Sequence, residues 1–187
     1  MDLEAAIVGR RSVRNYSSHP VEKEILMKLF SAATYAPSAT NSQPWAFAVI
    51  TDTALLKDLS TRAKSLLIES MREHPWLEKY RAALTNPDYN IFYNAPTLLI
   101  IYAKPEGPYP FLNCALAAEN LMLAAHAYGL GTCWIGFAQP LLDQPELKRE
   151  FGVPSEYQAV APIVVGYPQG QTPPIPRKKP EIIFWRA

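Results

Sequence analysis

The sequence is poor in cysteine, histidine and glycine, and each scarcity argues against a class of site. The 187 residues include two cysteines, three histidines and eight glycines. Cys114 and Cys133 lie too far apart for a CxxC motif, so we expect free, buried thiols in a reducing compartment. The histidines show no HxH or HExxH spacing, and we expect no metal site. Gly129, Gly131 and Gly136 do not form GxGxxG and follow a predicted helix, which argues against a Rossmann site for resident nicotinamide.

Long hydrophobic runs and an excess of charge of one sign are also missing. No apolar run reaches about 18 residues and no charged-then-apolar leader opens the chain, so we expect no membrane span and a cytoplasmic location. The 18 basic residues face 17 acidic ones, whereas a nucleic-acid-binding domain is normally clearly basic. We therefore expect no nucleic-acid partner. With 49% hydrophobic residues the chain can bury a full core, and its length predicts one domain, residues 1–187.

Two tight clusters of basic residues stand out against this balance. Arg10, Arg11 and Arg14 surround Ser12 near the start, and residues 177–179 (Arg177, Lys178 and Lys179) form a second group near the end. Arginine offers a planar fork of donors that matches phosphate oxygens, and serine adds a neutral donor. The clusters predict a site for one compact anion, a phosphate. The alternative is that they are ordinary solvated surface charges.

Hydrophobic periodicity and breaker residues predict an α+β fold, a mixed central sheet flanked by helices. We expect helices over residues 3–8, 20–36, 53–71, 110–128 and 143–151, and strands over 45–50, 97–102, 132–137 and 159–167. The aromatic-rich insert 74–94 predicts a lid or binding wall, or a loop that packs its aromatic residues on the core. Residues 168–187 form a proline-rich extended arm that ends in the strand-like sequence IIFW and is long enough to reach a neighbouring subunit.

An amide-rich and hydroxyl-rich loop lies between two prolines, in the sequence PSATNSQP. Ser38, Asn41, Ser42 and Gln43 supply hydrogen-bond donors and acceptors but no general acid, base or nucleophile. No Ser-His-Asp order, paired carboxylates or Cys-His pair stands out elsewhere, so we expect no catalytic side chain and a cofactor that carries the chemistry. A planar ring with heteroatom edges fits the loop and a phosphate fits the basic clusters. Together they predict flavin mononucleotide (FMN).

Five blocks of the sequence resemble the nitroreductase family, in that family's order: RRSVRNY, APSATNSQPW, IFYNAP, AAENLMLAAHAYGLGTCWIG and RKKPEIIFW. The resemblance implies a homodimer with exchanged C-terminal arms and with FMN at the subunit interface. It also implies a ping-pong cycle, in which NAD(P)H reduces the flavin and leaves before the oxidant binds. The family often has a pair of acids after the terminal proline, where this chain has PEII, so the register of the last basic cluster can differ by one residue.

The resemblance also assigns cofactor contacts. The phosphate, the ribityl chain and the pyrimidine edge would be bound by Arg10, Arg11, Ser12 and Arg14, and the phosphate site would be completed by Arg177 and Lys178. The ring would be contacted from the partner subunit by Pro37, Ser38, Ala39 and Asn41, with Gln43 of the same loop. The flavin would be lined by the backbone of Trp134, Ile135 and Gly136.

The first functional hypothesis is an FMN-dependent oxidoreductase that passes electrons from NAD(P)H to a small electron-poor acceptor, such as a nitroaromatic, a quinone or an activated alkene. Three alternatives remain open. The chain could store or sense flavin without turnover, could perform the flavin fragmentation or reductive dehalogenation also found in the family, or could bind a phosphorylated ligand or RNA through its basic clusters.

Overall fold

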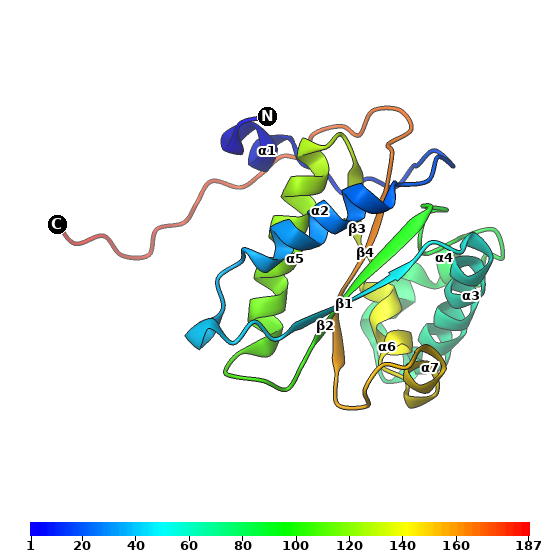
Figure 1. The fold of residues 1–187 in the computed structure, drawn as a ribbon. Helices are drawn as coiled ribbons and strands as arrows, with labels where there is room; N and C mark the ends of the chain where they lie inside the picture. Colours follow the sequence, from blue (N-terminus) through cyan, green and yellow to red (C-terminus); the bar gives the residue numbers. More distant parts are fainter.

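A four-stranded antiparallel sheet forms the centre of the computed structural model, which describes all residues 1–187 (Figure 1). Its strands run in the order β1-β2-β4-β3. In chain order the elements are α1 (Leu3–Gly9), α2 (Lys23–Thr34), the 3-10 turn η1 (Ala39–Asn41), β1 (Trp45–Ile50), α3 (Thr53–Glu69), η2 (Ser70–Arg72), η3 (Pro75–Tyr80), α4 (Arg81–Thr85), β2 (Thr97–Ala103), α5 (Pro110–Ala127), β3 (Gly131–Trp134), η4 (Gly136–Ala138), α6 (Gln139–Leu142), α7 (Pro145–Phe151) and β4 (Gln158–Gly166).

The central strand β2 is buried along its whole length because helices cover both faces of the sheet. Successive side chains of a strand point to opposite faces, and β2 follows this rule. Leu98 and Ile100 pack into the core on the α3 and α6 side, whereas Leu99 and Ile101 pack into the core beneath α2 and α5. The α+β class predicted from the sequence is confirmed.

Helix α5 is apolar on nearly every side, and this explains its central place. Ala117, Ala118 and Leu121 are fully buried between α2 and the sheet. The helix begins at Pro110, which suits the first turn because proline has no N–H to leave unpaired. It ends before Gly129, whose φ of +76° is readily adopted by glycine. No helix of the structure is both long and apolar enough to cross a bilayer.

Three details differ from the sequence-based expectations. The sheet of one chain is antiparallel rather than mixed, since its only parallel pairing is an isolated bridge between Ser12 and Thr132. Residues 139–142 form an extra short helix, α6. The predicted strand 132–137 is shorter than expected, because β3 ends at Trp134 and residues 136–138 form the 3-10 turn η4.

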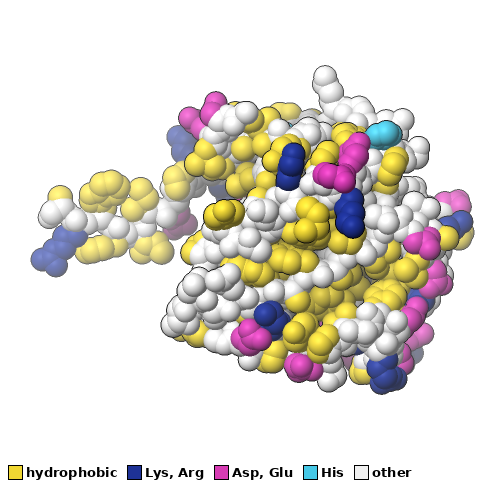
Figure 2. Space-filling model, in the orientation of Figure 1, with side chains coloured by type: hydrophobic (Ala, Val, Ile, Leu, Met, Phe, Trp, Pro, Cys, Tyr) yellow, Lys and Arg dark blue, Asp and Glu magenta, His cyan; other side chains and the backbone are white.

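The C-terminal arm leaves the body beside the segment that follows the first basic cluster. Tyr16 and Pro168 form an isolated antiparallel bridge, and the amide of Gln169 donates to the carbonyl of Asn15 at 2.9 Å. Gly170 and Thr172 still lie against the body near Arg10, and only the later part of the arm runs away from it with its hydrophobic side chains uncovered (Figures 1 and 2). The base of the arm is therefore fixed beside the basic cluster, while its end extends outward.

Candidate functional site

The first basic cluster lies along the exposed edge of the sheet. Helix α1 ends at Gly9, and the chain then extends beside β3, where the amide of Val13 donates to the carbonyl of Thr132 at 2.9 Å. A Cβ on Gly131 would lie 2.7 Å from a methyl carbon of Val13. This contact is shorter than side-chain Cβ atoms tolerate, so Gly131 permits the close approach that places Arg10 to Arg14 at the edge of β3.

The three arginines of this cluster have different partners. Arg10 forms an ion pair with Glu119 of α5, with Nε 3.5 Å from Oε1. Arg11 donates to the carbonyls of Val8 and Arg10 and thereby satisfies orphan acceptors at the end of α1. The guanidinium carbon of Arg14 lies 5.8 Å from the ring centroid of Tyr93, within the range of a cation–π contact. The side chains of Arg10 and Arg14 therefore contact other side chains, whereas that of Arg11 is hydrogen-bonded to backbone carbonyls.

A small pocket of about 320 Å³ adjoins the cluster. Arg10, Arg11, His126 and Thr132 contribute to its lining. Burial, together with the nearby cations of Arg11 and Arg10, lowers the pKa of His126 below its usual range. The lowered pKa favours the neutral form of His126, and Arg10 and Arg11 contribute positive charge to this pocket.

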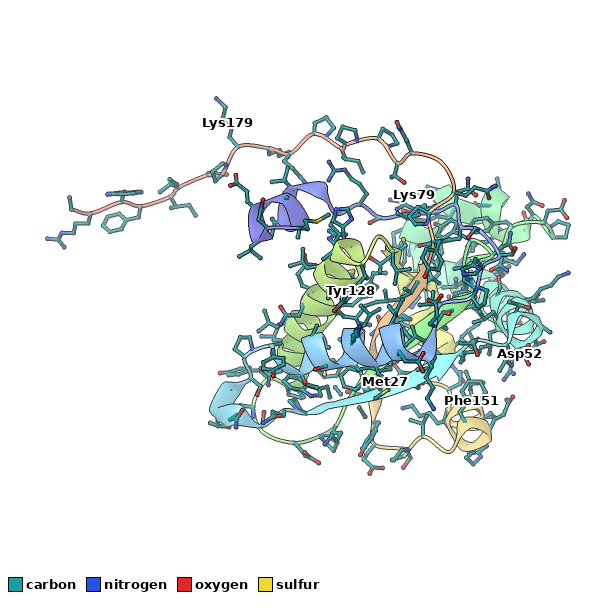
Figure 3. All side chains as sticks on the ribbon, turned by 45° about the horizontal axis from the view of Figure 1, so that its top comes forward. Met27, Asp52, Lys79, Tyr128, Phe151 and Lys179 are labelled. Atoms are coloured by element: carbon teal, nitrogen blue, oxygen red, sulfur yellow. The ribbon has the colours of Figure 1, made fainter.

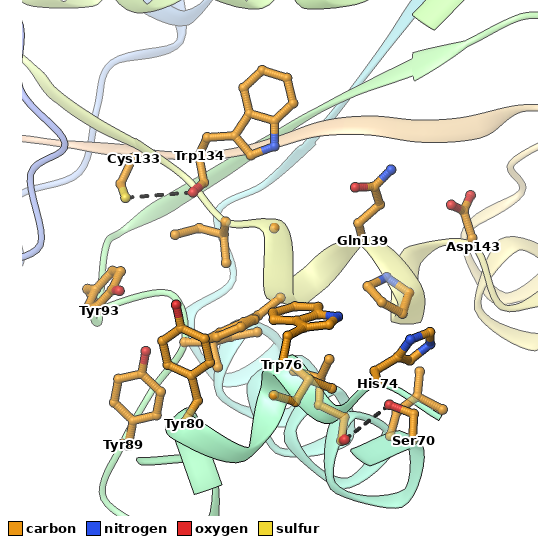
Figure 4. A pocket seen from close by; sticks show the side chains of 18 of the residues that line it. Ser70, His74, Trp76, Tyr80, Tyr89, Tyr93, Cys133, Trp134, Gln139 and Asp143 are labelled. Carbon is orange, nitrogen blue, oxygen red and sulfur yellow. Dashed lines mark hydrogen bonds between the residues drawn. The ribbon is translucent and has the colours of Figure 1, made fainter. Parts of the chain in front are cut away.

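The chain between Cys133 and Phe137 forms one wall of a much larger pocket, of about 1020 Å³ (Figure 4). Its backbone is fixed by the bond from the Ile135 amide to the carbonyl of Pro162, at 2.7 Å. A Cβ on Gly136 would meet nothing within 4 Å, so this wall has free space in front of it. Arg14 also lines the pocket. Burial raises the pKa of Cys133 above the usual thiol range, so its thiol stays neutral beside Arg14.

The aromatic-rich insert supplies the opposite wall of the large pocket. Trp76, Tyr80, Tyr89 and Tyr93 all line it. The sequence left open whether this insert is a lid or binding wall or a loop that packs its aromatic residues on the core, and in the structure its residues divide between the pocket wall and the core. Phe92 is buried in the main core, and Leu77 and Leu84 join Leu67 and Met71 in a smaller one. The four aromatic residues line the pocket instead.

The amide-rich loop 37–43 has a strained backbone. Thr40, Asn41 and Gln43 have φ values of 54°, 55° and 46°, in the left-handed region that non-glycine residues rarely adopt. The side chain of Ser38 accepts a bond from the amide of Gln43 at 3.0 Å, and this bond helps to hold the turn. Strain of this kind, at about 1–3 kcal/mol per residue, is often found at binding sites.

Asn113 anchors this loop, and sequence reasoning did not single it out. Its side-chain oxygen accepts from the amide of Ala39 at 3.2 Å, and its side-chain nitrogen donates to the carbonyl of Pro108 at 3.0 Å. Asn113 is only 4% exposed. An amide among the apolar residues at the start of α5 was the available signal, because a polar group that becomes buried needs a partner.

Within one chain the predicted site residues form separate groups. Arg10 to Arg14 lie beside Glu119 and the C-terminal end of α5, whereas loop 37–43 contacts Asn113 near the N-terminal end of that helix (Figure 1). About 20 Å of helix separates Asn113 from His126, at 1.5 Å per residue. Arg177 and Lys178 are exposed on the arm, and their neighbour Lys179 points away from the body (Figure 3). One chain brings together only the first basic cluster and the backbone of 134–136.

Comparison with known proteins identifies the family. The sequence profile described as "Nitroreductase family" matches residues 7–167. The chain belongs to the nitroreductase family. This nitroreductase-family chain is 30% identical over 174 residues to a protein of Methanothermobacter thermautotrophicus that is provisionally named NADH dehydrogenase/NAD(P)H nitroreductase. The match covers 90% of this chain and 78% of that protein. It is 29% identical over 175 residues to the iodotyrosine deiodinase of Thermotoga neapolitana, with 91% and 90% covered. It is also 28% identical over 191 residues to the 5,6-dimethylbenzimidazole synthase of Rhodospirillum rubrum, with 91% and 84% covered.

Two solved structures extend these similarities. A nitroreductase of Bacteroides fragilis with bound FMN superposes with a TM-score of 0.86 at 28% identity, over 100% of both chains. An iodotyrosine deiodinase bound to FMN and 3-iodo-L-tyrosine superposes with a TM-score of 0.77 at 25% identity, also over 100% of both chains. This nitroreductase-family chain therefore shares its whole fold with proteins that hold FMN.

Proposed function

We propose that this protein is an FMN-dependent oxidoreductase that takes electrons from NAD(P)H and delivers them to a small electron-poor acceptor. The observation that carries the proposal is the separation of two complementary groups along α5. The segment Arg10 to Arg14, whose side chains are of the kind that binds phosphate, lies near the C-terminal end of α5. The amide-rich loop 37–43 lies near the N-terminal end of the same helix. A second copy of the chain can bring the two groups together around one cofactor, which is the arrangement that the family resemblance implies.

The chemistry of the donors fits FMN. Arg10, Arg11 and Ser12 offer charged and neutral donors for a phosphate, and Arg14 reaches the large pocket where a ring would lie. The open space in front of Gly136 leaves room for a planar group against the backbone. We propose that Arg177 and Lys178 complete the phosphate site, and that Pro37, Ser38, Ala39, Asn41 and Gln43 of a second copy contact the ring.

Exposed hydrophobic side chains support a homodimer. Leu3, Ile7 and Val8 of α1 and Leu112 and Leu116 of α5 are each at least 48% exposed. The arm adds Ile182, Ile183, Phe184 and Trp185, which are 61–93% exposed. Large apolar groups gathered in this way mark an interaction surface. The dimer would cover these side chains and place each arm across the other copy.

When bound, FMN would accept a hydride from NAD(P)H and pass two electrons to the acceptor. For a nitroaromatic the sum is ArNO₂ + NAD(P)H + H⁺ → ArNO + NAD(P)⁺ + H₂O. The residues of this chain bind and orient, and the pocket needs no dedicated acid. His74 and Asp143 line the end of the pocket that is away from Tyr93. Protons would therefore come from water at the other end, beside Arg14 and Tyr93, where the ring would lie. The free, buried Cys114 and Cys133 support a reducing, cytoplasmic location.

A second candidate function, reductive dehalogenation, is favoured by the similarity to iodotyrosine deiodinases. It would use the same cofactor site with a halogenated aromatic as the oxidant. The two functions differ in the compound that reoxidises the flavin, so one experiment separates them.

The test is anaerobic flavin reduction followed by reoxidation. The purified protein should be yellow with about one FMN per chain, and NADPH or NADH should bleach the flavin bands. Nitroaromatics or quinones should restore the colour faster than halophenols do. Protein that stays colourless after incubation with FMN would refute the proposal. A flavin that NAD(P)H cannot bleach would instead indicate flavin storage or sensing.

A further inference from the structure

A histidine that the proposed function leaves without a role lies in the small pocket beside the first basic cluster. His126 belongs to the last turn of α5, and α1 lies beside this end of the helix (Figure 1). A Cβ on Gly9, the last residue of α1, would lie 2.6 Å from the Nε2 atom of His126. Because Gly9 has no side chain, the imidazole can pack directly against the start of the basic cluster.

The pocket that His126 lines has cations but no carboxylate. Its volume is about 320 Å³, and none of the thirteen residues that line it is an aspartate or a glutamate. Arg10 and Arg11 are its charged side chains. The pocket therefore has the room and the charge for a compact anion such as a phosphate.

The imidazole of His126 has no hydrogen-bond partner within the chain, and its surroundings favour the neutral form. Burial, together with the cations of Arg11 and Arg10, holds its pKa below the usual range. The C-terminal end of a helix, in contrast, favours a protonated histidine. An anion bound between these cations would offset their repulsion and add to the effect of the helix end.

The acidic residues on the neighbouring elements do not line this pocket. Glu119 of α5 is paired with Arg10, with 3.5 Å between Oε1 and Nε. Asp2 caps α1 by accepting from the amide of Ala5 at 2.7 Å, and Glu4 of the same helix is exposed. The place of an anion next to His126 is therefore not taken by a carboxylate of the chain itself.

The other charges around His126 are positive. The amino-terminal residue Met1 lines the pocket, and the ammonium of Lys28 lies 5.8 Å from the ring centroid of Tyr128, two residues beyond His126. The residues that β3 and the base of the arm add to the pocket are uncharged.

A second copy of the chain would not change the sign of this effect. Arg177 and Lys178, which we propose to complete the phosphate site, would add two further cations. More cations make the protonated imidazole less favourable before an anion binds. A phosphate attracts the protonated form whichever cations surround it, because opposite charges attract. Binding of the anion therefore raises the proton affinity of His126 in the monomer and in the dimer.

We propose that His126 is a proton-linked residue of the phosphate site, which takes up a proton from the solvent when the phosphate of FMN binds beside Arg10 and Arg11. This inference rests on the proposed function and adds a residue and a pH dependence to it. A phosphate monoester carries a charge of about −1.5 to −2 at pH 7, so it can stabilise an imidazolium close by. Since the pKa of His126 would be higher in the complex than in the free protein, FMN should bind more tightly as the pH falls between these two values.

NMR can follow the protonation of His126 directly. The chain has three histidines, and the His126→Gln variant assigns the Hε1 signal of His126. The full-length protein is titrated with acid in the presence and in the absence of FMN. The proton affinity of His126 should be at least tenfold higher with FMN bound. His19 is the internal control, because it lies on the surface beside Glu22 and its titration should not change.

Calorimetry measures the same proton during binding. FMN is added to the apoprotein at pH 7 in PIPES and in Tris, two buffers with different ionisation enthalpies. The wild type should take up more protons per FMN than His126→Gln, since any proton change of the phosphate itself is common to both. Between pH 6.5 and pH 8 the Kd for FMN should rise at least threefold more in the wild type than in His126→Gln. His19→Gln is the matched control and should behave as the wild type does.

Two results would overturn the inference. FMN that binds without changing the titration of His126 would show that the phosphate and the imidazole are not coupled. Equal proton uptake in the wild type and in a His126→Gln variant that circular dichroism shows to be folded would assign the linkage to another group. If FMN does not bind at all, the proposed function fails instead. Inorganic phosphate then replaces FMN in the NMR titration, and an unchanged His126 signal would overturn the inference as well.

Discussion

Arg10 and Glu119 form an ion pair that joins the first basic cluster to the central helix α5, with 3.5 Å between Nε and Oε1. Glu119 is the only charged residue of α5. Its carboxylate therefore holds Arg10 beside the small pocket at the end of the helix. The Arg10 side chain would thus be oriented before a phosphate binds.

Removal of the side chain of Arg10 or of Arg14 should weaken FMN binding. Arg10→Ala or Arg14→Ala should cost roughly 1.5–3 kcal/mol, because a hydrogen bond to a charged group is lost. This corresponds to about a ten- to hundredfold higher Kd, measurable by quenching of FMN fluorescence. Arg62→Ala is the matched control, since Arg62 forms surface pairs with Asp58 and Glu150. Normal flavin binding with lost hydride transfer would contradict the phosphate assignment.

Asn113 should be essential for the amide-rich loop. Asn113→Ala leaves the amide of Ala39 without its acceptor and should cost about 1–3 kcal/mol of unfolding free energy. Urea denaturation measures this loss, and flavin content should fall with it. Asn113→Asp keeps an acceptor for Ala39 but places a carboxylate oxygen against the carbonyl of Pro108 in a buried position, so its loss should be at least as large. A stable Asn113→Ala variant with full flavin content would show that the loop does not depend on this anchor.

Two glycines that are close in sequence should respond differently to alanine. Gly131→Ala places a Cβ 2.7 Å from Val13 and should destabilise the protein by about 1–3 kcal/mol through overpacking. Gly136→Ala meets nothing within 4 Å in the single chain, so its unfolding free energy without flavin should change by less than about 0.5 kcal/mol. It should instead weaken FMN binding, if the flavin lies against this backbone. Thermal unfolding and flavin titration of both variants test the contrast.

Deletion of residues 170–187 should abolish the dimer and the bound flavin together. The arm carries exposed apolar residues and the second basic cluster, so both functions depend on it. Sedimentation velocity and the flavin absorbance of the same sample measure the two losses. The double variant Arg177→Ala/Lys178→Ala keeps the apolar end and should remain dimeric with weakened FMN binding. A monomer with full flavin content would contradict the proposed exchange of arms.

Turnover should follow ping-pong kinetics. The loop and backbone assigned to the flavin ring contain amides, hydroxyls and main-chain groups but no histidine or carboxylate, and no Rossmann motif holds nicotinamide beside a second substrate. Donor and acceptor would therefore alternate in one pocket. Initial rates over a grid of NAD(P)H and acceptor concentrations should give parallel double-reciprocal lines. Intersecting lines would indicate a ternary complex and refute the shared pocket.

The sequence by itself determined the local elements and the chemistry they carry. The run of branched and aromatic residues in WAFAVI predicted β1, and TLLIIY predicted β2 to within one residue, because β-branched and aromatic residues are enriched in strands. The apolar spacing of α5 with its terminal Gly129 predicted a central helix. The arginine cluster was visible as a candidate anion site before any contact was known.

Only the tertiary structure decided how these elements meet. The antiparallel order of the sheet depends on pairing between distant segments such as β2 and β4, which no local pattern specifies. Asn113 became a site residue only when its buried amide met loop 37–43, 74 residues away in sequence from Ala39. The aromatic residues of the insert face a pocket because α3 anchors their loop through Lys64 and Ser60. Such contacts depend on three-dimensional neighbours, and sequence spacing does not reveal them.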